Sequence, residues 1–124
     1  MALYSLERFK CLLRAGEWDY LNRKRTFKNL DKLEWQDSDL LTMLYALNGT
    51  THFQKTVRNC KVNDCSCQDY VDADQYEIHW DEQKSIARGQ PMRGTVSLSL
   101  KIAILNDSNG EFAGVVVFHT SSEP

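Results

Sequence analysis

The chain has 124 residues, of which 42% are hydrophobic and 26% are charged, with 15 Lys and Arg against 17 Asp and Glu. This size and balance are typical of one globular domain, because domains cluster at roughly 100–150 residues. We therefore predict a single domain over 1–124, helical over 1–50 and mainly β over 51–124. The longest apolar run, 113–118, is far shorter than the ~20 residues of a membrane helix, and the N-terminus has no signal-peptide pattern. We expect neither a membrane protein nor an exported one.

Two segments within 1–50 have the apolar spacing of helices. The first follows the N-cap Ser5, ends near Gly16, and has an apolar stripe at Leu6, Phe9, Leu12 and Leu13. The second is capped by Asp37 or Ser38 and carries Asp39 in its first turn. Its apolar residues are Leu40, Leu41, Met43, Leu44 and Leu47. The stretch between the two helices is predicted to be a polar connection.

After residue 50 the apolar period changes from that of a helix to that of a strand. We predict strands over 53–58, 75–80, 95–105 and 112–119, with a loop over 63–74 and a hairpin loop over 106–110. Alternation places Phe53, Lys55 and Val57 on one face of the first strand. The prediction is an α+β fold, with two N-terminal helices packed on a mainly antiparallel four-stranded sheet.

The charge is distributed unevenly. Residues 1–61 carry 11 Lys and Arg against 7 Asp and Glu, whereas residues 62–124 carry 4 against 10. The basic half could contact a nucleic acid locally, or form an ordinary solvated helix face. The residues concerned are Arg23, Lys24, Arg25, Lys28 and Lys32.

Four cysteines are present, and without an export signal we expect reduced thiols in a cytoplasm. Cys60, Cys65 and Cys67 could bind a soft metal, but their spacing is poor for a structural zinc site, and no second pair follows. We expect incidental thiols and no metal, and we retain a metal-binding regulator as an alternative.

His119 ends the last apolar strand, where a rigid backbone could present its ring to a surface cleft. Histidine is the usual side chain for proton transfer near neutral pH. Cations near the same cleft would suit phosphoryl transfer, because they offset the charge that develops on the phosphate. Candidates for these cations are Lys55, Arg58, Arg88 and Arg93.

Several short sequence motifs follow one another along nearly the whole chain. They are Leu6-x-x-x-Lys10-x-Leu12-Leu13-x-Ala15-Gly16, then 40–47, Phe53-x-Lys55-Thr56, Ile78-His79-Trp80, 98–104, and Val116-Val117-Phe118-His119. Together they resemble the MqsR family of toxin–antitoxin toxins, which are mRNA interferases with a RelE-like fold.

The resemblance implies roles for particular residues. Lys55 matches the catalytic lysine of the family. His119 takes a basic position that is lysine in the best-known member and histidine in other RelE-like nucleases. The family glutamine after the strand tryptophan corresponds to Asp81, with Gln83 as a nearby substitute, and a family tyrosine corresponds to Ser99. Two of these four positions therefore depart from the family.

The activity implied is metal-independent cleavage of mRNA, in which a ribose 2′-hydroxyl attacks the adjacent phosphate. We expect His119 to act as acid or base and Lys55 to stabilise the phosphate, with the three arginines binding substrate. His79 and Asp81 share a strand face with Glu77 and could supply a second proton-transfer group. Trp18, Tyr20 or Tyr76 could stack on bases, or simply pack in the core.

The partners implied are single-stranded mRNA, free or on the ribosome, and a separate cognate antitoxin protein that silences the toxin. No cofactor is implied. The alternative of another class is a non-catalytic interaction or regulatory domain on the same fold, which the departures at Asp81 and Ser99 favour.

Overall fold

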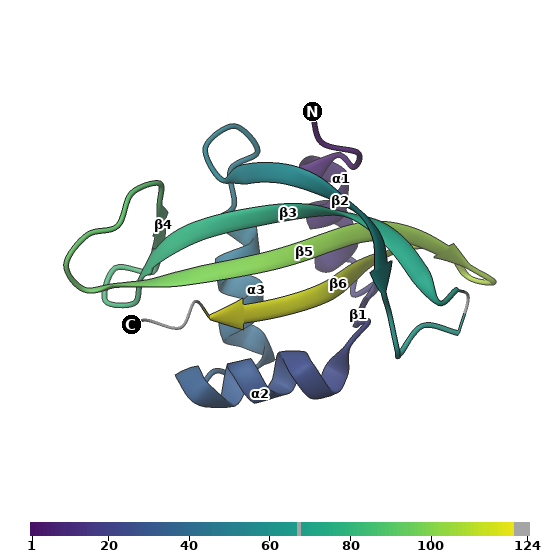
Figure 1. The fold of residues 1–124 in the computed structure, drawn as a ribbon, viewed down its shortest axis with the longest axis horizontal. Helices are drawn as coiled ribbons and strands as arrows, with labels where there is room; N and C mark the ends of the chain where they lie inside the picture. Colours follow the sequence, from purple (N-terminus) through teal and green to yellow (C-terminus); the bar gives the residue numbers. More distant parts are fainter. Residues whose placement is uncertain (67, 121–124) are drawn as a thin grey trace.

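A computed structural model describes residues 1–66 and 68–120, which form an α+β fold (Figure 1). Its elements are α1 (Leu6–Arg14), β1 (Trp18–Tyr20), α2 (Arg23–Leu33), α3 (Asp37–Tyr45), β2 (Phe53–Lys61), β3 (Tyr70–Asp81), β4 (Ile86–Arg88), β5 (Thr95–Asp107) and β6 (Gly110–Thr120). The strands form one mixed sheet in the order β1-β6-β5-β3-β2. Within the described residues, β1 and β6 are parallel, the other pairs are antiparallel, and β4 pairs with the end of β3.

The α+β class is confirmed, but the prediction of two helices and four strands was wrong, because the described part of the chain has three helices and six strands. The helix that was missed, α2, buries Thr26 and Asn29 beside Leu30, so its buried stripe is not apolar. The strands β1 and β4 have three residues each, too few for a period to be recognised. Part of the predicted 63–74 loop belongs to β3, which already begins at Tyr70.

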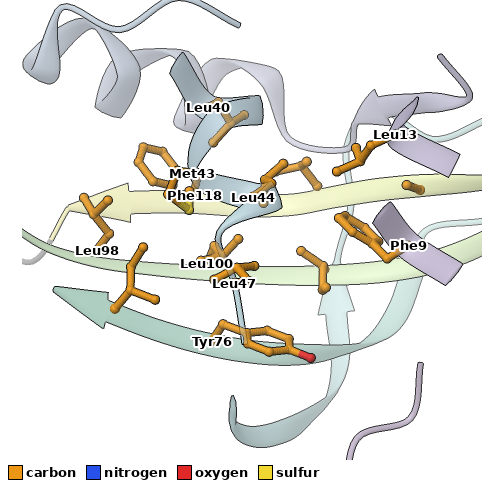
Figure 2. Packing of buried hydrophobic residues seen from close by; sticks show 14 of the residues in the cluster. Phe9, Leu13, Leu40, Met43, Leu44, Leu47, Tyr76, Leu98, Leu100 and Phe118 are labelled. Carbon is orange, nitrogen blue, oxygen red and sulfur yellow. The ribbon is translucent and has the colours of Figure 1, made fainter. Parts of the chain in front are cut away.

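The main core lies between the sheet and the helices α1 and α3 (Figure 2). Phe9, Leu40, Met43 and Leu44 are fully buried, and they pack against side chains of β3, β5 and β6. Ser5 caps α1 as predicted, since its Oγ accepts a hydrogen bond of 3.1 Å from Arg8 N. The cap of α3 is Gln36 rather than Asp37 or Ser38. The predicted apolar stripes of both helices therefore serve the core.

The helix α2 lies along the edge of β6 and satisfies backbone groups there. The strand β1 pairs with β6 only at residues 113–115. Beyond them, Asn22 Nδ2 donates to Val116 O at 2.7 Å, Thr26 Oγ1 accepts from Phe118 N at 3.4 Å, and Asn29 Oδ1 accepts from Thr120 N at 3.3 Å. These contacts explain why α2 buries polar side chains, since an uncovered strand edge leaves backbone groups unpaired.

The sheet face away from α1 and α3 is apolar at one end and polar at the other. A second buried cluster covers the apolar end, and it comprises Leu21, Val62, Val71, Ala73, Ala103, Leu105 and Val116. The polar remainder is formed by alternate residues of the same long strands.

Candidate functional site

The polar part of this sheet face, hereafter the open face, is defined by cross-strand pairing, because directly paired residues point to the same side of a sheet. One row of paired residues is Glu77, Ser99 and His119. The next is Lys55, Gln75, Lys101 and Val117, and a third is Arg88, His79 and Ser97. The structure thus brings Lys55, His79, His119 and Arg88, all predicted site residues, to one face.

Lys55 reaches the open face through an irregularity in β2. Phe53 pairs with Tyr76, whereas Lys55 pairs with Gln75, so the register shifts by one residue between them. Such a shift reverses the side to which following residues point. The prediction that Phe53, Lys55 and Val57 share a face was therefore wrong. Phe53 packs on the helix-side core, and the exposed Lys55 lies with Val57 on the other side.

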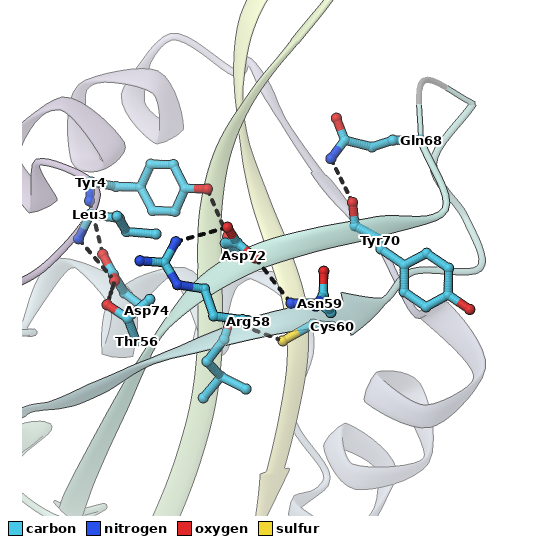
Figure 3. Close-up of polar contacts among 11 residues, drawn as sticks. Leu3, Tyr4, Thr56, Arg58, Asn59, Cys60, Gln68, Tyr70, Asp72 and Asp74 are labelled. Atoms are coloured by element: carbon cyan, nitrogen blue, oxygen red, sulfur yellow. Dashed lines mark hydrogen bonds and ion pairs between the residues drawn. The ribbon is translucent and has the colours of Figure 1, made fainter.

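Hydrogen bonds fix the position of β2 directly after Lys55. The next residue, Thr56, donates a hydrogen bond of 2.9 Å from Oγ1 to Asp74, a residue with no exposed surface (Figure 3). The same carboxylate accepts hydrogen bonds from Leu3 N at 3.0 Å and Tyr4 N at 2.9 Å. A buried carboxylate with three donors is well satisfied. These contacts link the N-terminal segment to the β2–β3 pair and hold the shifted register in place.

His119 is a half-buried imidazole on the open face. Burial lowers the pKa of His119 below its ordinary 6.5, the nearby cations Lys101 and Arg25 lower this pKa further, and Glu77 opposes them. The lowered pKa favours the neutral form of the ring. A neutral imidazole can accept a proton, so the surroundings favour a base over an acid at this position.

Lys55 and His119 lie at opposite sides of the open face. They are on β2 and β6, with β3 and β5 between, so three strand spacings of about 4.8 Å separate their backbones by roughly 14 Å. Gln75 and Lys101 fill the space between them, in the same row as Lys55. The site is thus a strip of polar groups across four strands rather than a compact cluster.

His79 and Glu77 also lie on the open face, as predicted from the alternation in β3. His79 is half-buried, and its Nδ1 is 3.0 Å from Ser97 Oγ. Glu77 is exposed, and its Oε2 accepts a hydrogen bond of 3.3 Å from Gln75 Nε2. Each therefore has a partner that orients it and remains near solvent.

Asp81 and Gln83 belong to a turn. Asp81 Oδ1 accepts hydrogen bonds of 3.1 Å from the backbone N–H groups of Gln83 and Lys84, and Oδ2 is 3.3 Å from Arg88. The bond from Lys84 lowers the pKa of the Asp81 carboxyl, burial opposes this, and Arg88 lowers it further. These contacts fit a turn-closing role, and none of them brings Asp81 or Gln83 to Lys55 or His119.

The three arginines predicted to bind substrate occupy different places. Arg58 forms an ion pair of 2.9 Å with Asp72 (Figure 3). Arg88 is held by Asp81, and its Nε is buried without a hydrogen-bond partner among the described residues. Arg93 is exposed in the connection between β4 and β5. Arg88 alone has a register position on the open face.

The aromatic residues considered for base stacking are mostly core residues. Tyr20 and Tyr76 are 6% and 1% exposed, and Trp18 is half-buried against Tyr20. Burial raises the pKa of Tyr76 to about 12. The buried rings of Tyr20 and Tyr76 are not available to a base.

The three cysteines considered as an alternative metal site are described only in part. Cys67 lies outside the described residues, and Cys60 and Cys65 border the second buried cluster. In the part of the chain that the structure describes, no three His, Cys, Asp or Glu side chains are grouped so that they could hold a metal ion.

A basic groove adjoins the open face between the first half of α2 and the end of β2. It consists of two adjoining hollows of about 780 Å³ and about 240 Å³, which share Asn22, Arg25 and Lys61. The smaller hollow reaches Lys101 and Val117 of the open face. The cations that line the basic groove without an ion pair among the described residues are Lys24, Arg25, Lys28, Lys61 and Lys101.

Sequence reasoning did not assign Lys101 or Gln75 to the site. Both alternate with core residues, since Lys101 lies between Leu100 and Ile102, and Gln75 precedes Tyr76. This alternation could have indicated a polar face opposite the core. The pairing of Gln75 with Lys55 could not have been predicted, because it depends on the register shift.

Comparison of the chain with protein-family models, with curated proteins and with solved structures gives no match. None of the helices in residues 1–66 and 68–120 combines the length and apolar character that crossing a membrane requires.

Proposed function

We propose that this chain is the toxin of a type II toxin–antitoxin system, an endoribonuclease that cleaves single-stranded mRNA in the cytoplasm and is silenced by a separate antitoxin protein. The antitoxin and the RelE-like assignment rest on the resemblance to the MqsR family. The observation that carries the ribonuclease proposal is the open face itself. It places a histidine with a lowered pKa on the same side of the sheet as Lys55 and Lys101.

In the proposed reaction His119 acts as the base. It accepts the proton of a ribose 2′-hydroxyl, the 2′-oxygen forms a bond to the adjacent phosphorus, and the bond from phosphorus to the 5′-oxygen breaks. The products are a 2′,3′-cyclic phosphate and a 5′-hydroxyl. Lys101 and Lys55 stabilise the charge that develops on the phosphate oxygens. His79 is the candidate acid for the departing 5′-oxygen.

The face also offers a glutamine in a different place from the one the sequence suggests. Gln75 pairs with Lys55 and lies in the row of Lys101, whereas Gln83 lies in the β3–β4 turn. An amide at this point can donate a hydrogen bond to a phosphate oxygen. We assign the supporting role of the family glutamine to Gln75, rather than to Asp81 or Gln83.

The experiment compares induced expression of wild type, Lys55→Ala and His119→Ala, with Lys84→Ala as a control in the exposed β3–β4 turn. We expect growth arrest and new 5′ ends on cellular mRNA for the wild type and the control, with both effects relieved by either of the other substitutions. Purified wild type should cleave RNA in the presence of EDTA and leave 2′,3′-cyclic phosphate ends.

The second pair of variants tests the glutamine assignment. Gln75→Ala should lower the cleavage rate about 10-fold or more, as expected when a transition-state hydrogen bond is lost, whereas Gln83→Ala should not change it. Folded, soluble wild type that neither arrests growth nor cleaves RNA would support the interaction-domain alternative instead. The buried Ser99, where the family has a tyrosine, favours that alternative.

A further inference from the structure

Several cations of the basic groove lie in the first turn of α2, where positive charge destabilises a helix. The first turn of α2 begins Arg23-Lys24-Arg25 and contains no acidic residue. The N-terminal end of a helix carries a partial positive charge, so cations there are unfavourable. Arg23 is offset by an ion pair of 2.9 Å with Asp19, and its backbone N–H donates to the Asp64 carboxylate at 2.7 Å, whereas within the described residues Lys24 and Arg25 form no ion pair. Such a local cost is expected where the charges have a function.

At the far side of the basic groove, a lining cation contacts an exposed aromatic ring that adjoins the two hollows without lining them. Lys61 lines both hollows, and its Nζ lies 5.3 Å from the centre of the Tyr70 ring. Tyr70 is 54% exposed, unlike the tyrosines of the core. Proteins that bind single-stranded nucleic acid combine cations that follow the backbone with aromatic rings that stack on bases.

The basic groove is continuous with the open face. Its smaller hollow is lined by Arg25, Lys101 and Val117. Val117 pairs with Lys101 and is two residues from His119 on β6, so the hollow ends beside the proposed base. A nucleic-acid strand bound in the basic groove would therefore extend to His119.

We propose that the basic groove binds the phosphate backbone of single-stranded RNA next to the cleavage position, with Tyr70 stacking on a base. The inference rests on the proposed function in one respect, namely that the RNA strand bound in the basic groove continues over the open face. An acidic protein segment would need only the cations, whereas RNA would also use an aromatic ring for stacking. The exposed ring of Tyr70 therefore favours RNA.

The test measures binding of a 2′-O-methyl RNA oligonucleotide, which has no free 2′-hydroxyl and cannot be cleaved, by fluorescence anisotropy over a range of salt. The variant is Lys24→Gln with Lys28→Gln, two exposed groove residues one helical turn apart. The control is Arg14→Gln with Lys84→Gln, which removes the same charge from exposed positions outside the groove.

The size of the effect follows from counterion release. Each phosphate contact to a single strand contributes about 0.7 to the slope of log K against log salt, so losing two contacts lowers the slope by about 1.4 and weakens binding about 25-fold at about 0.1 M salt. The control should remain within about twofold of wild type. Tyr70→Ala should weaken RNA binding at least about fivefold, yet leave the binding of inorganic polyphosphate unchanged.

The outcomes separate this inference from the proposed function. Equal affinities for the groove variant and the control would overturn the groove assignment, even if the wild type cleaves RNA. Groove-dependent binding without cleavage would support the groove and reject the nuclease. If polyglutamate of equal charge competes as well as RNA, or if the wild type binds no RNA, the inference is wrong.

Discussion

The carboxylate of Asp74 allows a sharp prediction, because Asp72, two residues away, provides a matched control on the same strand. Asp74 has no exposed surface and accepts three hydrogen bonds, from Thr56, Leu3 and Tyr4. Asp72 has a side chain that is 38% exposed, and it binds Arg58, whose side chain is 63% exposed. We predict that Asp74→Ala is severely destabilising and that Asp72→Asn is nearly neutral.

The magnitude follows from the contacts that each variant loses. A hydrogen bond to a charged group contributes about 1.5–3 kcal/mol, and an unsatisfied buried donor costs a comparable amount. The Leu3 side of the contact lies in an exposed N-terminal segment that water can reach, so the three losses do not add in full. We expect Asp74→Ala to lower the free energy of unfolding by about 3–4 kcal/mol. Asp72 also accepts a hydrogen bond of 3.0 Å from Asn59 N, which the amide oxygen of the variant can still accept. Asp72→Asn therefore loses mainly an exposed ion pair, which contributes about 0–1 kcal/mol.

The assay is urea unfolding, followed by fluorescence of the tryptophans, with Thr56→Val as a third variant. Thr56→Val removes one of the three bonds and should cost about 1 kcal/mol. Under conditions where Asp74→Ala remains folded, we expect it to lose cleavage activity as well, because the register next to Lys55 is no longer fixed. A loss below about 1 kcal/mol for Asp74→Ala, or equal losses for the two aspartates, would refute this reasoning.

Three further predictions concern the imidazoles and the core. Lys101→Met removes a cation beside His119, so it should raise the pKa of His119 and move the acid limb of the cleavage rate to higher pH. Glu77→Gln removes a carboxylate and should have the opposite effect on this pKa and on the acid limb. NMR titration of the three imidazoles measures the pKa of His119 in each variant. Burial also lowers the pKa of His52 below 6.5, although a backbone contact partly opposes this. Since both histidines bind a proton more weakly when folded, the stability that they contribute is complete above 6.5 and is lost as the pH falls, so the urea midpoint should drop between about pH 7.5 and about pH 5.5. Phe118→Ala, at a position with no exposed surface, should cost about 3–5 kcal/mol in the same urea assay.

The parts of the fold that could be predicted from sequence are those in which one period persists. The stripe of α1 and the strands predicted over 95–105 and 112–119 were placed correctly, because each has an apolar pattern that continues over several residues. The helix α2 could not be recognised in this way. Its buried residues Thr26 and Asn29 bind the backbone of β6, about 90 positions along the chain, and no local pattern reports such a contact.

The candidate site was predictable in part for the same reason. Glu77 and His79 were placed correctly by simple alternation in β3. The side to which Lys55 points was not, because a single irregularity in β2 reverses it. The role given to Gln83 followed its distance along the chain from Trp80, whereas the structure places Gln75 beside Lys55 across the β2–β3 pair.

This last difference bears on whether the departures from the family pattern argue against catalysis. The side chains of a site on a sheet face form rows across the strands. The glutamine that the family has after its strand tryptophan, and that is absent after Trp80, can therefore be replaced by a side chain at another position in these rows. In the proposed reaction we assign this replacement of the glutamine to Gln75. Ser99 does not replace a tyrosine, but it is buried between Glu77 and His119, so the row keeps a proton acceptor at one end and a carboxylate at the other. What the proposed reaction requires is a neutral base and cations around the phosphate, and His119 with Lys101 and Lys55 would supply these without the missing tyrosine.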